Sequence, residues 1–187
     1  SNPPARATEL SIGPALEAGP LRIFPIAEPD HQAWMGRALR EAQAAADEGE
    51  VPVGCVAVHE GRLVGRAHNQ RETLRDPTAH AEMLALTQAS ATLSSWRLTG
   101  VTLYVTLEPC TMCAGAIVLA RIDRLVFGAL DPKAGACGSV YDVVRDARLN
   151  HEVEVVTGIR EEECGGILKS FFRDRRGMRR GAGAAER

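Results

Sequence analysis

The sequence predicts a single α/β domain with a mixed sheet of about five strands covered by helices. Apolar residues recur at helical spacing in several stretches, and short β-rich runs lie between them. One strand–helix–strand segment has links short enough for a parallel βαβ unit. The chain has 187 residues, of which 45% are hydrophobic, so it can bury one substantial core. We assign residues 29–187 to this domain.

The first part of the chain divides into an extension, a helix and a hairpin. Residues 1–28 are rich in Pro, Ala and Gly without a steady period, and we expect a poorly ordered extension. Apolar residues at helical spacing from His31 to Glu48 predict an amphipathic helix. Residues 53–58 and 63–67 are expected to pair as a hairpin around the Glu60-Gly61 turn.

The second part alternates between helices and strands. Asp76-Pro77-Thr78 is a helix-start signal, because Asp can cap a helix and Pro fits its first turn. We expect that helix to run to about Ser94, with His80 and Glu82 in its opening turn. The remaining expected elements are a strand at 101–106, a helix at 110–120, strands at 124–127 and 153–156, and a last helix from Glu161 into the arginine-rich tail.

The cysteines and the apolar runs point to a reducing, aqueous compartment. The five cysteines are Cys55, Cys110, Cys113, Cys137 and Cys164, and an odd count argues against a disulfide framework. Three of them, Cys55, Cys137 and Cys164, have apolar or Gly-rich neighbours and are expected to be buried. No apolar run approaches the roughly 20 residues that cross a bilayer, and no signal peptide opens the chain. We therefore expect a cytoplasmic protein without a membrane partner.

The charge is concentrated at the end of the chain. The net charge is −2, but residues 171–187 hold six arginines against two acidic residues. A local basic patch can bind phosphates even on a slightly acidic protein. The alternative is a solvated helix end, where cations complement the helix dipole.

Two short motifs carry the chemistry. They are His80-Ala81-Glu82 and Pro109-Cys110-Thr111-Met112-Cys113. One His and two Cys can hold zinc with the fourth position open to water, as in catalytic rather than structural sites. Thiolates are stabilised at a helix N-terminus, and Glu82 is placed to move the protons of such a water. A lone C-x-x-C is weak evidence, but the joint pattern indicates hydrolysis at a carbon that carries an amino group.

These residues resemble the zinc-dependent nucleoside and base deaminases. Within that superfamily the chain is similar to the bacterial-type tRNA adenosine deaminases from about Trp34 to Arg176. The resemblance rests on Glu50-Val51-Pro52-Val53-Gly54, Asn69, residues 76–82, residues 104–117, Phe127-Gly128-Ala129, Asp131, Lys133, Gly138-Ser139, Asn150-His151, Phe171-Phe172-Arg173 and Arg175-Arg176. It implies a cytidine-deaminase-like, three-layer α/β/α fold.

The resemblance also implies an activity and its partners. The expected reaction converts adenosine to inosine at the wobble position of a tRNA anticodon, usually in the arginine tRNA with an A-C-G anticodon. One Zn²⁺ per chain, held by His80, Cys110 and Cys113, would activate water, and Glu82 would shuttle protons. A homodimer with the anticodon stem-loop across both subunits is expected, in a bacterial cytoplasm or, for a plant or alga, a plastid.

The resemblance further assigns residues around the substrate. Asn69, Val51 and Pro52 are expected to line the base, and Asp131 to contact the neighbouring ribose. The full set of substrate-binding residues that we expect is Val51, Pro52, Asn69, Ala81, Glu108, Pro109, Asp131, Lys133, Phe171, Arg173, Arg175 and Arg176. Cys55, where the family commonly has Ala, and Leu130, where it often has a polar residue, are departures.

Two other functions remain open at this point. A deaminase of a free base or nucleotide such as guanine, cytosine or deoxycytidylate would use the same zinc core. A zinc-stabilised RNA-binding module without turnover is the second alternative, but it has no obvious use for Glu82 or for an open zinc position.

Overall fold

The structure, a computed structural model, describes residues 30–185, with side chains described as far as Gly177. The extension predicted for residues 1–28 lies outside this range. In chain order the elements are α1 (His31–Asp47), β1 (Gly54–His59), β2 (Arg62–His68), α2 (Arg71–Leu74), α3 (Ala81–Leu93), β3 (Val101–Leu107), α4 (Thr111–Leu119), β4 (Arg124–Ala129), β5 (Glu154–Thr157) and α5 (Glu161–Ala185).

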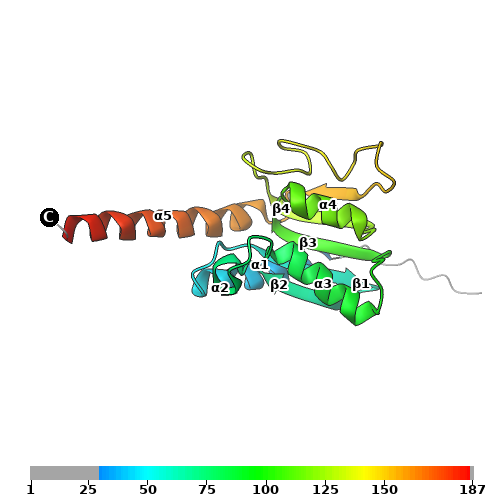
Figure 1. Cartoon of the computed structure of the whole chain (residues 1–187), viewed down its shortest axis with the longest axis horizontal. Coiled ribbons are helices and arrows are strands. Elements are labelled where there is room, and N and C mark those ends of the chain that lie inside the picture. Colours follow the sequence, from blue (N-terminus) through cyan, green and yellow to red (C-terminus); the bar gives the residue numbers. More distant parts are fainter. Residues whose placement is uncertain (1–29, 186–187) are drawn as a thin grey trace, which may run out of the picture.

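The five strands form one mixed sheet in the order β2-β1-β3-β4-β5. Strand β1 is antiparallel to both of its neighbours, while β3, β4 and β5 are mutually parallel. Side chains alternate between two cores, one under α3 and α4 and the other under α1 and the start of α5. Helices therefore cover both faces of the sheet (Figure 1), and the predicted three-layer α/β/α fold is confirmed.

The hairpin and the βαβ unit form where the sequence predicts them. Glu60 and Gly61 have φ angles of 49° and 72°, the two positive values that a type I′ hairpin turn requires. The βαβ unit consists of β3, α4 and β4, with Leu103 opposite Leu125. Because β3 and β4 are parallel, their carboxyl ends lie at the same edge of the sheet.

The predicted start of the helix at residues 76–78 is wrong. The carboxylate of Asp76 accepts hydrogen bonds from the N–H and the hydroxyl of Thr78, at 2.8 and 2.7 Å. This local turn competes with helix formation, and α3 begins only at Ala81, with His80 as its N-cap. The one-turn helix α2 lies just before this turn. It was not among the elements predicted from the sequence.

The beginning of helix α5 packs against the domain. Cys164 packs so closely against Gly128 on β4 that a Cβ at position 128 would collide with its sulfur. The guanidinium of Arg160 similarly fills the space in which Gly36 of α1 would carry a Cβ. From there the 25-residue helix projects away from the sheet (Figure 1).

No helix in the described part of the chain combines the length and the apolar character that a membrane span requires.

Candidate active site

The three predicted metal ligands come together at the starts of two helices. His80 is the N-cap of α3 and Cys110 is the N-cap of α4, so both lie one step before the helices in which we expected them. Cys113 lies in the first turn of α4. The Nδ1 atom of His80 is 3.7 Å from Sγ of Cys110 and 3.6 Å from Sγ of Cys113.

This geometry fits a zinc ion. Zinc–sulfur and zinc–nitrogen bonds at a tetrahedral angle put a sulfur and a nitrogen ligand about 3.6 Å apart, which agrees with both separations. The three ligand atoms lie within 4.8 Å of one another, and within residues 30–185 no other group of His, Cys, Asp and Glu side chains converges in this way. A bound ion would therefore have three protein ligands.

The ionisation of the two thiols also favours the binding of a cation between them. Hydrogen bonds from Cys113 and then from His80 lower the pKa of Cys110 to about 3. The pKa of Cys113 is raised, first because its thiol donates to Cys110 and then because it is buried. Two adjacent sulfurs thus share one proton in the absence of a metal, and a divalent cation can take the place of that proton.

Glu82 lies beside this group with its side chain out of water. It is only 4% exposed, and burial is the main reason that its pKa is raised. Cys113 and His80 are among the groups that affect this pKa. A carboxyl group with a raised pKa can both take up and release a proton near neutral pH.

A cavity of about 160 Å³ opens at this edge of the sheet. It is much smaller than the pockets that take drug-sized ligands and has room for one flat ring system. Its lining residues are Val51, Val53, Asn69, Arg71, His80, Glu82, Leu107, Glu108, Cys110, Asp131 and Ala134. Of the predicted site residues, Val51, Asn69, Glu108 and Asp131 thus lie at the cavity together with His80, Glu82 and Cys110.

The other predicted residues lie beside the cavity or on α5. Pro52, Ala81 and Pro109 are chain neighbours of lining residues, and Lys133 lies in the loop between Asp131 and Ala134. On α5, Phe171 is half-buried, and the guanidinium of Arg175 is 5.5 Å from its ring centre. The remaining predicted residues on this helix are Arg173 and Arg176, which are exposed.

Sequence reasoning missed several residues that shape the cavity. Val53, Arg71, Leu107 and Ala134 line it. Glu50 supports its wall, because this buried carboxylate accepts a 2.7 Å bond from the N–H of Thr73 in α2 and a long 3.5 Å bond from Asn69. For Arg71, the sequence indicated a place at the cavity only through its position two residues after Asn69.

Glu108 is buried at the base of the loop that follows β4. It is 2% exposed, and its carboxylate accepts hydrogen bonds from residues 131, 137 and 139. Burial raises its pKa, but the bonds from Ser139 and from the backbone outweigh this effect, and the pKa is lowered overall. Glu108 is therefore ionised at neutral pH.

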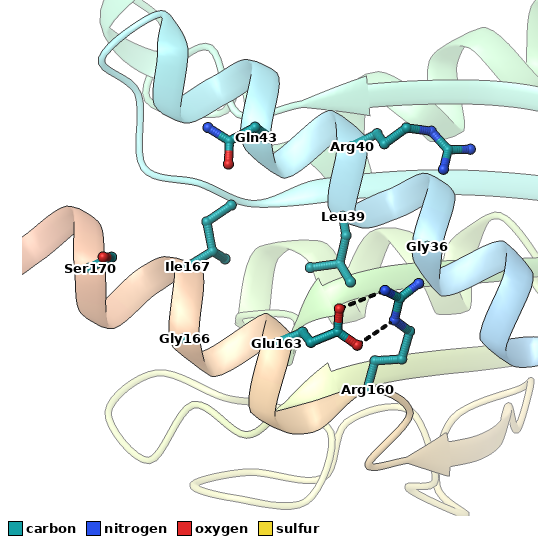
Figure 2. A pocket seen from close by; sticks show the side chains of 9 residues that line it. All are labelled: Gly36, Leu39, Arg40, Gln43, Arg160, Glu163, Gly166, Ile167 and Ser170. Carbon is teal, nitrogen blue, oxygen red and sulfur yellow. Dashed lines mark hydrogen bonds and ion pairs between the residues drawn. The ribbon is translucent and has the colours of Figure 1, made fainter.

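A second cavity of about 560 Å³ lies between α1 and α5. Figure 2 shows its nine lining residues, among them the paired Arg160 and Glu163. It shares no lining residue with the first cavity. The predicted catalytic residues His80, Glu82 and Cys110 line the smaller cavity, and none of them lines the larger one.

Known proteins share this architecture. Residues 29–176 match the family model of the MafB19-like deaminases. A tRNA-specific adenosine deaminase of Bacillus subtilis (strain 168) is 52% identical over 149 residues, which cover 80% of this chain and 92% of the relative. That of Haemophilus influenzae (strain Rd) is 49% identical over 143 residues, or 76% of this chain and 83% of the relative.

The chain belongs to the tRNA-specific adenosine deaminase family. This confirms the resemblance found in the sequence. A solved structure from work on A-to-I editing by tRNA:A34 deaminases at the wobble position of transfer RNA has a TM-score of 0.71 and 46% identity, and covers 73% of this chain and 99% of that chain. A solved guanine deaminase of Bacillus subtilis is 35% identical with a TM-score of 0.52, over 55% of this chain and 66% of that chain. The deaminase fold thus also occurs in enzymes of free bases.

Proposed function

We propose that this protein hydrolyses adenosine to inosine and ammonia at the wobble position of a tRNA anticodon, with the A-C-G arginine tRNA as its substrate. The observation that carries this proposal is a base-sized cavity that holds His80, Cys110 and the buried Glu82 together. The relatives from Bacillus subtilis, at 52% identity, and Streptococcus pyogenes, at 42%, are tRNA-specific adenosine deaminases, which supports tRNA rather than a free base as the substrate.

His80, Cys110 and Cys113 would hold one zinc ion. When bound, zinc lowers the pKa of a water molecule and so provides a nucleophile near neutral pH. The start of α4 supports this role, since the dipole and the free N–H groups at a helix N-terminus favour negative charge on Cys110 and Cys113.

Glu82 would move the protons of the reaction. Hydrolysis requires one proton to reach N1 of the adenine ring and another to reach the leaving amino group as the C6–N bond breaks. Glu82 lines the cavity, and its raised pKa suits a group that accepts a proton and then delivers it.

The walls of the cavity would hold an extruded base. Val51 and Val53 provide apolar lining, and Asn69 provides a polar group. Asp131 also lines the cavity, where it would contact a neighbouring ribose, with Lys133 two residues further along the chain. A base bound in so small a cavity would shield the reacting atoms from bulk water.

Helix α5 and a second copy of the chain would complete the RNA-binding surface. Arg173, Arg175 and Arg176 are exposed on a helix that projects beyond the edge of the sheet, and arginines so placed can contact phosphates. The homodimer is part of this proposal. In its favour, Leu119 at the end of α4 is 71% exposed and offers an apolar contact.

Sequencing of tRNA tests the activity directly, because inosine is read as G. We expect conversion at the wobble position of the A-C-G arginine tRNA, or of its anticodon stem-loop, and far less product from free adenosine, cytidine or guanine. The phosphate contacts that stabilise an extruded base are lacking in a free nucleoside. Turnover of free guanine with none on the stem-loop would refute the tRNA substrate and favour a free-base deaminase.

A further inference from the structure

The carboxylate of Glu108 has no hydrogen-bonding capacity left for a substrate. An ionised carboxylate offers about four lone-pair sites. Oε1 accepts the N–H groups of Cys137 and Ser139 at 3.0 and 2.9 Å. Oε2 accepts the N–H of Asp131 at 3.0 Å and a short bond from the Ser139 hydroxyl. Each oxygen thus has two donors, all from the same loop.

The loop that receives these bonds forms one wall of the cavity. Residues 131–139, here called the 131–139 loop, begin one residue after the end of β4 and include two lining residues, Asp131 and Ala134. Asp131 in turn accepts the N–H groups of Lys133 and Ala134, at 3.0 and 3.3 Å. Glu108 therefore fixes the backbone of Asp131, and Asp131 fixes the turn that follows it.

The loop also packs Ala136 and Cys137 into the core and makes backbone bonds to residues 140–143, but Asp131 at its start depends on Glu108 for its N–H bond. The loop contains no helix or strand, and its other backbone bonds to the site region are the Ala136 N–H to Pro109 bond and the bridge between Gly135 and Cys110. Gly135 passes so close to Glu108 that a Cβ at position 135 would collide with the carboxyl group. The carboxylate is thus enclosed by the loop that it organises.

We infer that Glu108 is a positioning residue: its carboxylate holds the 131–139 loop in place and acts on the substrate only through that loop, chiefly through Asp131. This inference rests on the proposed function and replaces the direct substrate contact expected from the sequence. A carboxylate suits the task because only Asp and Glu side chains accept about four bonds without donating any, and the longer Glu side chain reaches the loop here.

Glu108→Gln is the sharpest substitution, because it keeps the size of the side chain. Its amide has one oxygen and one NH₂ group. In either orientation the NH₂ group faces at least one backbone N–H, that of Asp131 or those of Cys137 and Ser139, which is then left without an acceptor. We expect kcat/KM on the anticodon stem-loop to fall about 10- to 100-fold, as it does when the partners of site residues are removed.

A double-mutant cycle with Asp131→Ala separates positioning from direct contact. If Glu108 acts through Asp131, the loss caused by Glu108→Gln shrinks at least about threefold in the Asp131→Ala background. Glu50→Gln is the matched control, because Glu50 is also a buried carboxylate that accepts a backbone N–H bond, that of Thr73, but it makes no bond to the 131–139 loop. In the double variant, the fold-losses in kcat/KM caused by Glu50→Gln and by Asp131→Ala should multiply to within about twofold. If the fold-losses in kcat/KM caused by Glu108→Gln and by Asp131→Ala also multiply in the double variant, the inference is overturned.

Two further measurements do not depend on turnover. Amide hydrogen exchange should accelerate at Asp131, Cys137 and Ser139 in Glu108→Gln, while zinc content stays at the wild-type level. Unchanged exchange, or loss of zinc, would overturn the inference. If Glu108→Gln does not fold, Ser139→Ala can be used instead, because it removes only the hydroxyl bond to the same carboxylate and should lower kcat/KM. Ser139→Thr keeps a hydroxyl at this position and should therefore keep kcat/KM near the wild-type value. Wild-type turnover of the stem-loop decides the proposed function separately from these results.

Discussion

Nδ1 of His80 lies 3.7 Å from Sγ of Cys110, although 30 residues separate them in the chain. Each is the N-cap of its helix, α3 or α4, and the two helices pack on the same face of the sheet. The separation between these atoms therefore depends on how the two helices pack, and a shared metal ion would join their first turns. A metal ion bound here would therefore be part of the fold as well as of the proposed reaction.

We expect one zinc ion per chain, and Cys110→Ala should lose it. Without the ion the thermal midpoint should fall, because metal binding contributes to folding. Elemental analysis and thermal unfolding with and without a chelator measure both effects. Cys137→Ala is the control, since Cys137 is buried nearby but lies outside the three-residue group. Zinc loss in that variant, or zinc retention in Cys110→Ala, would contradict this ligand set.

Glu82→Gln should separate binding from chemistry. The variant should fold, keep its zinc and bind tRNA, while kcat falls by at least ~10²–10⁴, the range for removal of a general acid–base group. Single-turnover assays and tRNA binding measure the two properties. Glu162→Gln, an exposed change at the start of α5, should leave kcat unchanged. Near wild-type turnover of Glu82→Gln would exclude Glu82 as the proton carrier.

Neutralising Arg173, Arg175 and Arg176 together should weaken tRNA binding and flatten its dependence on salt. Each lost phosphate contact should reduce the slope of log K against log salt by about 0.7–0.9. A triple change of the exposed Arg62, Arg97 and Arg148, none of which lies on α5, is the charge-matched control. Equal effects of the two triple changes would leave α5 with no specific role in RNA binding.

Because of Tyr104, we expect the free energy of unfolding to fall in alkaline solution. Its buried ring packs under α1, its hydroxyl lies 3.0 Å from Nδ1 of His31, and burial raises its pKa to about 12. The unfolded value is about 10, so the folded protein retains more protons between these pH values, and its free energy of unfolding falls as pH rises through this window.

Tyr104→Phe should reveal this dependence by removing it. At pH 7 the variant should be less stable by about 1 kcal/mol, the cost of one hydrogen bond. The deficit should narrow above pH 10, where only the wild type ionises. His31→Ala is the control, because it removes the same bond but keeps the phenol. Denaturant unfolding at pH 7 and pH 11 measures the difference, and a deficit that stays constant would contradict the pKa shift.

Periodic and motif-bearing segments were predictable from the sequence, while segments fixed by single polar contacts were not. The strands around Leu103 and Leu125 and the ligand set of His80, Cys110 and Cys113 follow from patterns that the chain carries locally. The delayed start of α3 depends on one side chain, that of Asp76, which bonds to Thr78 instead of capping a helix. The four donors around Glu108 come from a loop more than 20 residues away, and no local pattern encodes that distance.

The direction of α5 is determined where it leaves the domain. Gly36 and Gly128 leave space for Arg160 and Cys164, which hold the first turn of this helix. The 25 residues of α5 span about 37 Å at the rise of an α-helix. A tilt of about 10° at the first turn would move the far end by about 6 Å, roughly one helical turn. A single methyl group added at Gly128, where it would collide with Cys164, would therefore change which part of a bound molecule the far end of α5 reaches.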